Sequence, residues 1–130
     1  MRLLQTLRTS MSALTAERLR LDLIAGNLAN LNTTRTPAGE PYRRLVPVFS
    51  PRPAGGVEVT GVVADPAAFP VRHDPGHPDA DADGFVRMPN VDLVAEMVDL
   101  MAATRAYEAN ATVAQATRTL AQRTLEIGRS

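Results

Sequence analysis

The position of the prolines is the feature that most constrains how this chain folds. All ten prolines lie between Pro37 and Pro89, and six of the eight glycines fall in the same stretch. Proline inside a helix removes a hydrogen-bond donor and clashes with the preceding turn. Long helices are therefore possible only before and after this stretch. We predict a helix, a proline-rich middle segment and a second helix, in that order.

The residues before the prolines, about Leu3 to Leu31, carry an apolar repeat typical of a helix. Arg18 and Ala25 occupy two positions of this repeat, and Gly26 within it costs about 1 kcal/mol relative to alanine. We expect the helix to end within residues 30–34, where Asn and Thr side chains compete for backbone hydrogen bonds. The large apolar side chains alternate at spacings of three and four, as in a coiled-coil seam; they are Leu4, Leu7, Met11, Leu14, Leu21 and Leu28.

The residues after the prolines, about Val91 to Ile127, form the second predicted helix. Asn90 is a suitable N-cap, and Gly128 is a suitable residue just past the C-terminal end. At about 1.5 Å per residue, this helix is about 55 Å long. An apolar stripe runs along it and shifts once; its members are Val94, Met97, Val98, Met101, Ala102, Ala106, Ala109, Val113, Ala116, Leu120 and Ile127.

Two interpretations of these stripes stay open. They could form the core of one helical hairpin, or they could pack against other copies or other chains as well. Two long helices cannot cover each other's faces all round, which favours the second interpretation. Arg105 and Glu108 are three residues apart and can form a weak ion pair. Tyr107 either fills a notch on a neighbouring helix or lies on a half-exposed face.

The middle segment, residues 35–90, is expected to contain short strands. Val57–Val63 starts with strand-like alternation after a Gly-Gly turn, and Val46–Phe49 and Phe85–Met88 are further candidates. The prolines exclude a regular central sheet. The predicted fold class is mainly α. Long N- and C-terminal helices, within residues 1–34 and 91–130, pair as a coiled-coil hairpin, and a short β-hairpin with extended loop wraps on them.

Composition excludes several classes of function. The 130 residues suffice for one domain, and fourteen acidic residues balance fourteen basic ones, all arginine. No net field attracts nucleic acid or an anionic membrane. Cysteine is absent, which excludes disulfides, thiolate nucleophiles and zinc–thiolate sites. No apolar run approaches the roughly 18 residues that span a bilayer. We expect no nucleic-acid partner, no membrane insertion, no cleaved signal peptide and no cofactor.

Two clusters in the middle segment have residue types that bind metals. Asp79–Gly84 resembles the start of an EF-hand loop, but Asn90 stands where the loop needs its glutamate. His73 and His77 would share a face only on a helix, which the intervening proline prevents. We interpret the first cluster as a solvated acidic turn and the second as loop histidines. No serine or histidine is paired as a nucleophile and base, so we expect no catalytic activity.

Three blocks of sequence resemble the axial proteins of the bacterial flagellum, the family of rod and hook proteins. The middle block and the short chain favour the rod members. Gly26 departs from the family pattern, which has Asn there. The matching stretches are Leu23–Asn30, Asn32–Pro37 and Pro41–Arg44 in the first block, Asp74–Asp81, Gly84–Val86 and Met88–Val91 in the second, and Glu96–Val98, Arg105–Asn110 and Leu125–Arg129 in the third.

The resemblance implies a structural subunit of the basal-body rod. Family members pass unfolded through the flagellar type III export apparatus, without a cleaved signal, and polymerise into a helical tube across the periplasm. The implied partners are other copies of the chain and other flagellar rod proteins. The terminal helices would form an inner coiled-coil layer, and residues 35–90 would form an arm that reaches neighbouring subunits.

The stripes and the resemblance together predict a subunit interface. Two alternatives come from other classes. One is a soluble coiled-coil adaptor or secretion chaperone that binds through the C-terminal helix, and the other is a calcium-regulated module that rests only on the aspartate run. The predicted interface residues are Leu14, Leu21, Asn27, Leu28, Asn30, Tyr42, Arg43, Arg105, Tyr107, Ala109, Asn110, Val113, Ala116 and Leu120.

Overall fold

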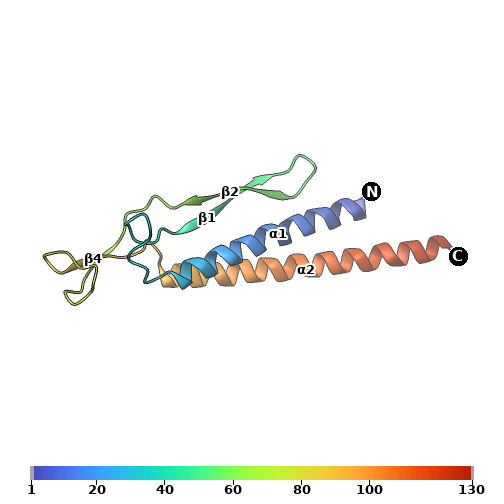
Figure 1. The fold of residues 1–130 in the computed structure, drawn as a ribbon. Coiled ribbons are helices and arrows are strands. Elements are labelled where there is room, and N and C mark those ends of the chain that lie inside the picture. The colour runs from blue at the N-terminus through green and yellow to red at the C-terminus, as the bar shows by residue number, and fades with distance from the viewer. Residues whose placement is uncertain (1, 130) are drawn as a thin grey trace.

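The computed structural model describes residues 2–129, which form two long helices with two small sheets between them in sequence. Helix α1 spans Arg2–Ala29 and helix α2 spans Leu93–Arg129. The helices pack side by side in opposite directions, so that both ends of the chain lie at the same end of the molecule (Figure 1). The predicted order of helix, middle segment and helix is confirmed.

The helix ends differ in part from the prediction. Helix α1 stops close to the expected residues, and the Asn30 side chain donates a hydrogen bond of 2.9 Å to the Gly26 carbonyl. The N-cap of α2 is Asp92, not Asn90, because the Asp92 carboxylate accepts the N–H of Val94 at 2.9 Å. Gly128 lies inside α2, so its predicted place past the helix end is wrong.

Strands β1 (Leu45–Pro51) and β2 (Val57–Ala64) form an antiparallel hairpin that contains two of the three predicted strands. A bulge interrupts the register between Val48 and Phe49. Two prolines lie within β1, and they are tolerated because a strand with a single neighbour does not need every N–H for the ladder.

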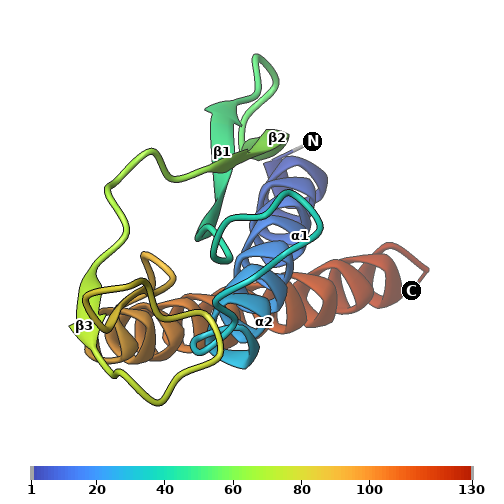
Figure 2. The ribbon, with the colours of Figure 1, turned by 60° about the vertical axis from the view of Figure 1, so that its left-hand side comes forward.

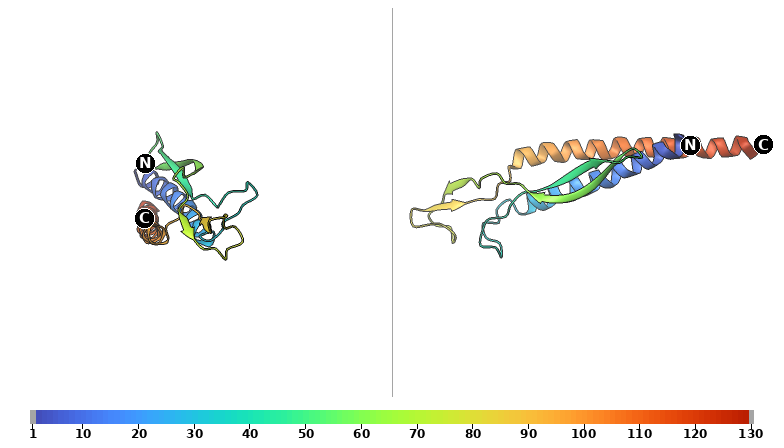
Figure 3. Two further views of the ribbon diagram at one scale, coloured as in Figure 1. Left: turned by 90° about the vertical axis from the view of Figure 1, so that its left-hand side faces the viewer. Right: turned by 90° about the horizontal axis from the view of Figure 1, so that it is seen from above.

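A second antiparallel pair joins β3 (Val71–His73) to β4 (Phe85–Arg87). Strand β4 was predicted, but β3 was not, and the expectation of one hairpin is therefore incomplete. Strand β3 has three residues and follows a proline, so it is too short to show an alternating pattern. This sheet lies at the far end of the molecule, beyond the start of α2 (Figures 1 and 3).

The β1–β2 hairpin packs along α1, on the side away from α2 (Figure 2). Its tip turns at Gly55 and Gly56, which both have a positive φ that glycine adopts readily. The tip lies against the first half of α1, where the Ser12 hydroxyl accepts the N–H of Val57 at 3.2 Å. The hairpin thus forms a second layer over α1.

Helix α2 extends past the start of α1 (Figure 3). The last buried residue of α2 is Thr117, and the turns from Arg118 to Arg129 are exposed or half-buried. At about 1.5 Å per residue this overhang is about 18 Å long. Neither helix in the described chain is apolar enough over a sufficient length to cross a bilayer.

Candidate assembly surfaces

The seam between the two helices is built mostly from small and polar side chains, with few large apolar ones such as Ile24. In α1, the residues that face it recur at spacings of three and four and include Ser10, Ile24 and Asn27, which are buried. In α2, Ala103 is fully buried. The inward positions of α2 keep the same alternation, and they are Glu96, Leu100, Ala103, Tyr107, Asn110, Ala114, Thr117 and Ala121.

The apolar stripe predicted for the second helix faces outward instead. Val94 is 70 % exposed and Leu120 is 53 % exposed, and the members between them are also exposed except for Ala106. The interpretation that this stripe forms the core of a helical hairpin is therefore wrong. The sequence pattern is the same for a stripe that covers a partner helix and one that faces away, because the period of the helix alone sets it.

The large apolar residues predicted to form the repeat of α1 are also not fully buried. Leu4 and Met11 are exposed, whereas Leu7, Leu14, Leu21 and Leu28 are half-buried. Some of this stripe borders the hairpin, since Leu7 and Met11 line a crevice of about 650 Å³ together with Val57 and Val59. Both helices thus present large apolar side chains outside their common seam.

Asn27 connects the end of α1 to the start of the hairpin. Its side-chain oxygen accepts the Tyr42 hydroxyl at 2.8 Å and the N–H of Leu45 at 3.0 Å, and its side-chain nitrogen donates to the Leu45 carbonyl at 3.0 Å. Burial, with the nearby charge of Glu96, raises the pKa of Tyr42 above its ordinary 10.0. The phenol therefore stays a hydrogen-bond donor.

Arg44 lies at the centre of a charged cluster beside Asn27. It donates hydrogen bonds to Glu96, which is only 1 % exposed, and to Asp65 at 3.2 Å and Asp99 at 3.4 Å. Burial alone would lower the pKa of Arg44, but the bonds and charges of Glu96 and Asp65 raise it above its ordinary value. The guanidinium thus neutralises a carboxylate that would be costly to bury alone.

The pKa of the Asp65 carboxyl is lowered below its ordinary 3.8. The main cause is the Ala67 N–H, which donates to the carboxylate at 2.9 Å, and Arg44 adds to the shift. Arg43 extends the same region outward, where its guanidinium donates to the Asp65 carbonyl at 3.0 Å and stacks 4.2 Å from the centre of the Phe69 ring. The segment after β2 is therefore tied back to the start of β1.

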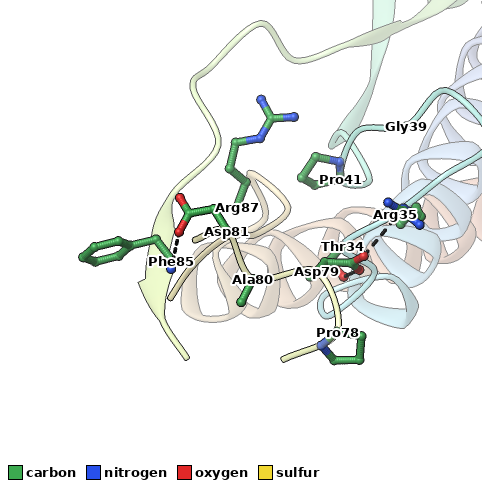
Figure 4. A pocket seen from close by; sticks show the side chains of 10 residues that line it. All are labelled: Thr34, Arg35, Gly39, Pro41, Pro78, Asp79, Ala80, Asp81, Phe85 and Arg87. Carbon is green, nitrogen blue, oxygen red and sulfur yellow. Dashed lines mark hydrogen bonds and ion pairs between the residues drawn. The ribbon is translucent and has the colours of Figure 1, made fainter. Parts of the chain in front are cut away.

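The acidic run of the middle segment closes a turn at the far end. The Asp81 carboxylate accepts the N–H groups of Asp83 and Phe85, both at 2.9 Å, and Asp79 accepts the Thr34 hydroxyl at 2.6 Å. Asp79 and Asp81 border a shallow pocket of about 380 Å³ that is also lined by Arg35 (Figure 4). Within residues 2–129, no three acidic or histidine side chains converge as metal ligands do.

The structure brings together only some of the residues predicted for the subunit interface. Asn27, Tyr42 and Arg43 meet at the root of the hairpin. Asn30, just past the end of α1, bonds the Gly26 carbonyl of that helix, and Asn110 bonds the Ala106 carbonyl within α2. Tyr107 is half-buried, and the expected ion pair between Arg105 and Glu108 is absent from the described chain. The exposed members are Arg105, Ala109, Val113, Ala116 and Leu120.

Sequence reasoning missed the roles of Arg44, Asp65 and Glu96. Glu96 was the clearest signal, because it is one charged side chain amid the apolar stripe of Val94, Met97 and Val98. A charge in such a setting is found exposed or paired. Nothing in the sequence, however, says that its partner is an arginine about fifty residues earlier.

Comparisons with known proteins agree with the flagellar resemblance. Residues 7–35 match the family described as "Flagella basal body rod protein", and residues 82–127 match "Flagellar basal body rod FlgEFG protein C-terminal". Three relatives carry the description "Flagellar basal-body rod protein FlgC". That of Borreliella burgdorferi is 38 % identical, over 98 % of this chain and 98 % of the relative. That of Bacillus subtilis is 41 % identical, over 95 % and 97 %. That of Escherichia coli O6:H1 is 43 % identical, over 90 % and 91 %. The chain therefore belongs to the FlgC family of flagellar basal-body rod proteins.

Proposed function

We propose that this chain, a structural subunit of the bacterial flagellar basal-body rod, assembles through the outward apolar stripes of its two helices. The observation that carries the proposal is the division of residues in α2. Small and polar side chains face α1, whereas Val94, Val98 and Leu120 face outward. A monomer that exposes such a stripe gains more from covering it than a chain with a conventional core would.

The chemistry of the stripes fits helix-to-helix contacts between subunits. Burial of apolar surface contributes about 25 cal/mol per Å² before the cost of ordering is subtracted. The second half of the α2 stripe alternates alanine with larger residues, and such small side chains let a neighbouring helix approach closely. The terminal helices, residues 1–34 and 91–130, then form a coiled-coil inner layer with copies of this chain and with other rod proteins.

The middle segment, residues 35–90, serves as an arm toward neighbouring subunits in this proposal. Contacts that do not close on themselves propagate as a helical filament. The rod so formed spans the periplasm, and its subunits reach it through the flagellar type III export apparatus without a cleaved signal peptide. No relative named above is an adaptor or a chaperone, so that alternative gains no support.

The test combines deletion in the native host with matched helix variants. Basal bodies are purified and imaged after complementation with the intact chain, with Leu120→Glu or with Gln122→Glu. Both substitutions add a charge to the same exposed overhang, but the two positions lie nearly opposite each other around the helix. We expect rods with the intact chain and with Gln122→Glu, and loss of rods with Leu120→Glu. Normal rods with Leu120→Glu would contradict assembly through the stripe. Normal rods in the deletion strain would show that the chain is not needed to build the rod.

A further inference from the structure

The root of the hairpin is held to the helices by one charged cluster, in which Glu96 is buried and the other side chains are partly exposed. Arg44, just before β1, bonds Glu96 and Asp99 of α2 and Asp65 after β2. Arg20 of α1 also approaches Asp99, at 4.0 Å. Two arginines thus meet three carboxylates, two of them from α2 and one from the segment after β2. Arg44 is the only group within residues 2–129 that bonds all three.

Asn27 and Asn90 complete the same cluster. The Asn27 side chain lies 3.5 Å from the Glu96 carboxylate while it holds the backbone of Leu45. The Asn90 side chain accepts the N–H of Arg44 at 2.7 Å and donates to the Asp65 carbonyl at 3.0 Å. The cluster therefore joins the start of β1, the end of β2 and the first turns of α2, and it forms only when all three segments are folded and in contact.

The rest of the hairpin does not touch α2. Strands β1 and β2 pack on α1 and, in the described chain, not on α2. Near the tip, Gln5 donates to the Ala54 carbonyl at 3.3 Å, and Ser12 accepts from Val57. The direct side-chain bonds that join the hairpin to α2 are therefore at its root, in the cluster around Arg44.

We propose that Arg44 is a latch that fixes the β1–β2 arm to the helix pair and closes only after α2 has docked on α1. Three carboxylates without the guanidinium would repel one another and would leave Glu96 buried without a countercharge. Docking of α2 supplies Glu96 and Asp99, and the arm then takes one orientation. This inference deepens the proposed function, since the use of a fixed arm in the rod rests on it. The latch itself is a property of the single chain.

Distances measured between spin labels in the purified full-length chain test the latch. The chain has no cysteine, so introduced cysteines are the only labelling sites. Labels at Glu58→Cys in β2 and Glu108→Cys in α2 measure the distance between the arm and α2. Labels at Arg18→Cys in α1 and Glu108→Cys measure the distance between the two helices. All three positions are exposed. The variants are Arg44→Met and Arg44→Met/Glu96→Met. The control is Arg72→Met, which removes an exposed pair with Asp74 at 3.7 Å.

The double variant separates a latch from an ordinary buried ion pair. It removes the buried charge of Glu96, so the helices are expected to keep a narrow distance distribution. It leaves Asp65 and Asp99 without the guanidinium, so the arm distribution is expected to widen at least twofold. Arg44→Met alone should widen both the arm distribution and the helix distribution, and Arg72→Met should widen neither of them.

Several results would overturn the latch. One is a narrow arm distribution in either Arg44 variant. Another is a wide arm distribution in the unaltered chain. The third is equal widening of the arm distribution and the helix distribution in the double variant. In the last case the cluster would be part of the helix core and nothing more. Because the measurement uses single chains, it stands whether or not the chain forms rods. If the rod experiment failed while all the distance distributions came out as expected, only the proposed function would be contradicted.

Discussion

The side-chain amide of Asn27 pairs with both backbone groups of Leu45. The oxygen accepts the Leu45 N–H and the nitrogen donates to the Leu45 carbonyl, each at 3.0 Å. Asn27 thereby acts as a short piece of partner strand for the first residue of β1. Its position at the end of α1, where it is buried, fixes where the hairpin begins relative to the helix. An Asn side chain can do this because its planar amide carries the acceptor oxygen and the donor nitrogen as two separate atoms, as a peptide group does.

Replacement of this amide is expected to destabilise the fold strongly. Asn27→Ala leaves the Leu45 backbone groups and the Tyr42 hydroxyl without their partner, and a buried unsatisfied group costs about 1–3 kcal/mol. We expect the free energy of unfolding, measured with urea, to fall by about 2–3 kcal/mol. The control is Asn32→Ala, which removes an exposed amide. An Asn27→Ala chain as stable as this control would show that the pairing does not hold the arm.

Two glycines are expected to respond to alanine in opposite directions. A Cβ at Gly56 would overlap the Ser12 hydroxyl, and the residue has a φ of +87°, so Gly56→Ala should loosen the hairpin tip from α1. Gly26 lies inside α1, and beyond its own stretch of helix backbone no atom lies within 4 Å of the added Cβ. Gly26→Ala should therefore stabilise the chain by about 1 kcal/mol. The measurement is the midpoint temperature of thermal unfolding of each variant. A higher midpoint for Gly56→Ala than for the unaltered chain would contradict the contact between the hairpin tip and α1.

The helices and most strands could be predicted because their signals are local. The prolines restrict helix to the two ends of the chain, and the Gly55-Gly56 turn marks the hairpin. The seam could not be predicted in the same way. Large apolar residues dominate the pattern, yet Ser10, Ala103 and Glu96 face the partner helix. The interior of a single chain and the interior of an assembly give the same apolar period, so sequence alone does not say which one a stripe belongs to.

The cluster at the root of the hairpin was hidden for a different reason. Arg44 meets Asp65 and Glu96 through contacts 21 and 52 residues apart in sequence. No local spacing rule covers such pairs. The cap of α2 was misplaced for a related reason, because Asn90 and Asp92 are equally good caps by type. Asn90 is instead used by the Arg44 backbone, a tertiary contact that the sequence does not show.

Stability should decline in acid partly through Asp65. The folded chain holds the pKa of this carboxyl below 3.8, its ordinary value, so the contribution is present above that pH and is lost as the pH falls through the folded pKa. We expect Asp65→Asn to lower stability at pH 7 and to narrow the difference between pH 7 and pH about 3. The measurement is urea unfolding at both pH values. The control is Asp83→Asn, an exposed carboxylate without a recorded bond in the described chain. If the free energy of unfolding changed between the two pH values as much in Asp65→Asn as in the unaltered chain, protonation of this carboxyl would not affect folding.

Enlarging an alanine should have different effects on the two faces of α2. Ala116 and Ala109 are exposed in the single chain, so Ala116→Leu or Ala109→Leu should leave its fold and helix content intact. In the proposed rod packing, the added atoms would separate neighbouring helices at this face, and we expect loss of motility. Ala103 is fully buried against α1, so Ala103→Leu should instead destabilise the single chain by about 1–3 kcal/mol through overpacking. Circular dichroism of the purified chain and swimming of the complemented strain separate the two effects. Normal swimming with Ala116→Leu and Ala109→Leu would mean that no close-packed helix layer forms on this face.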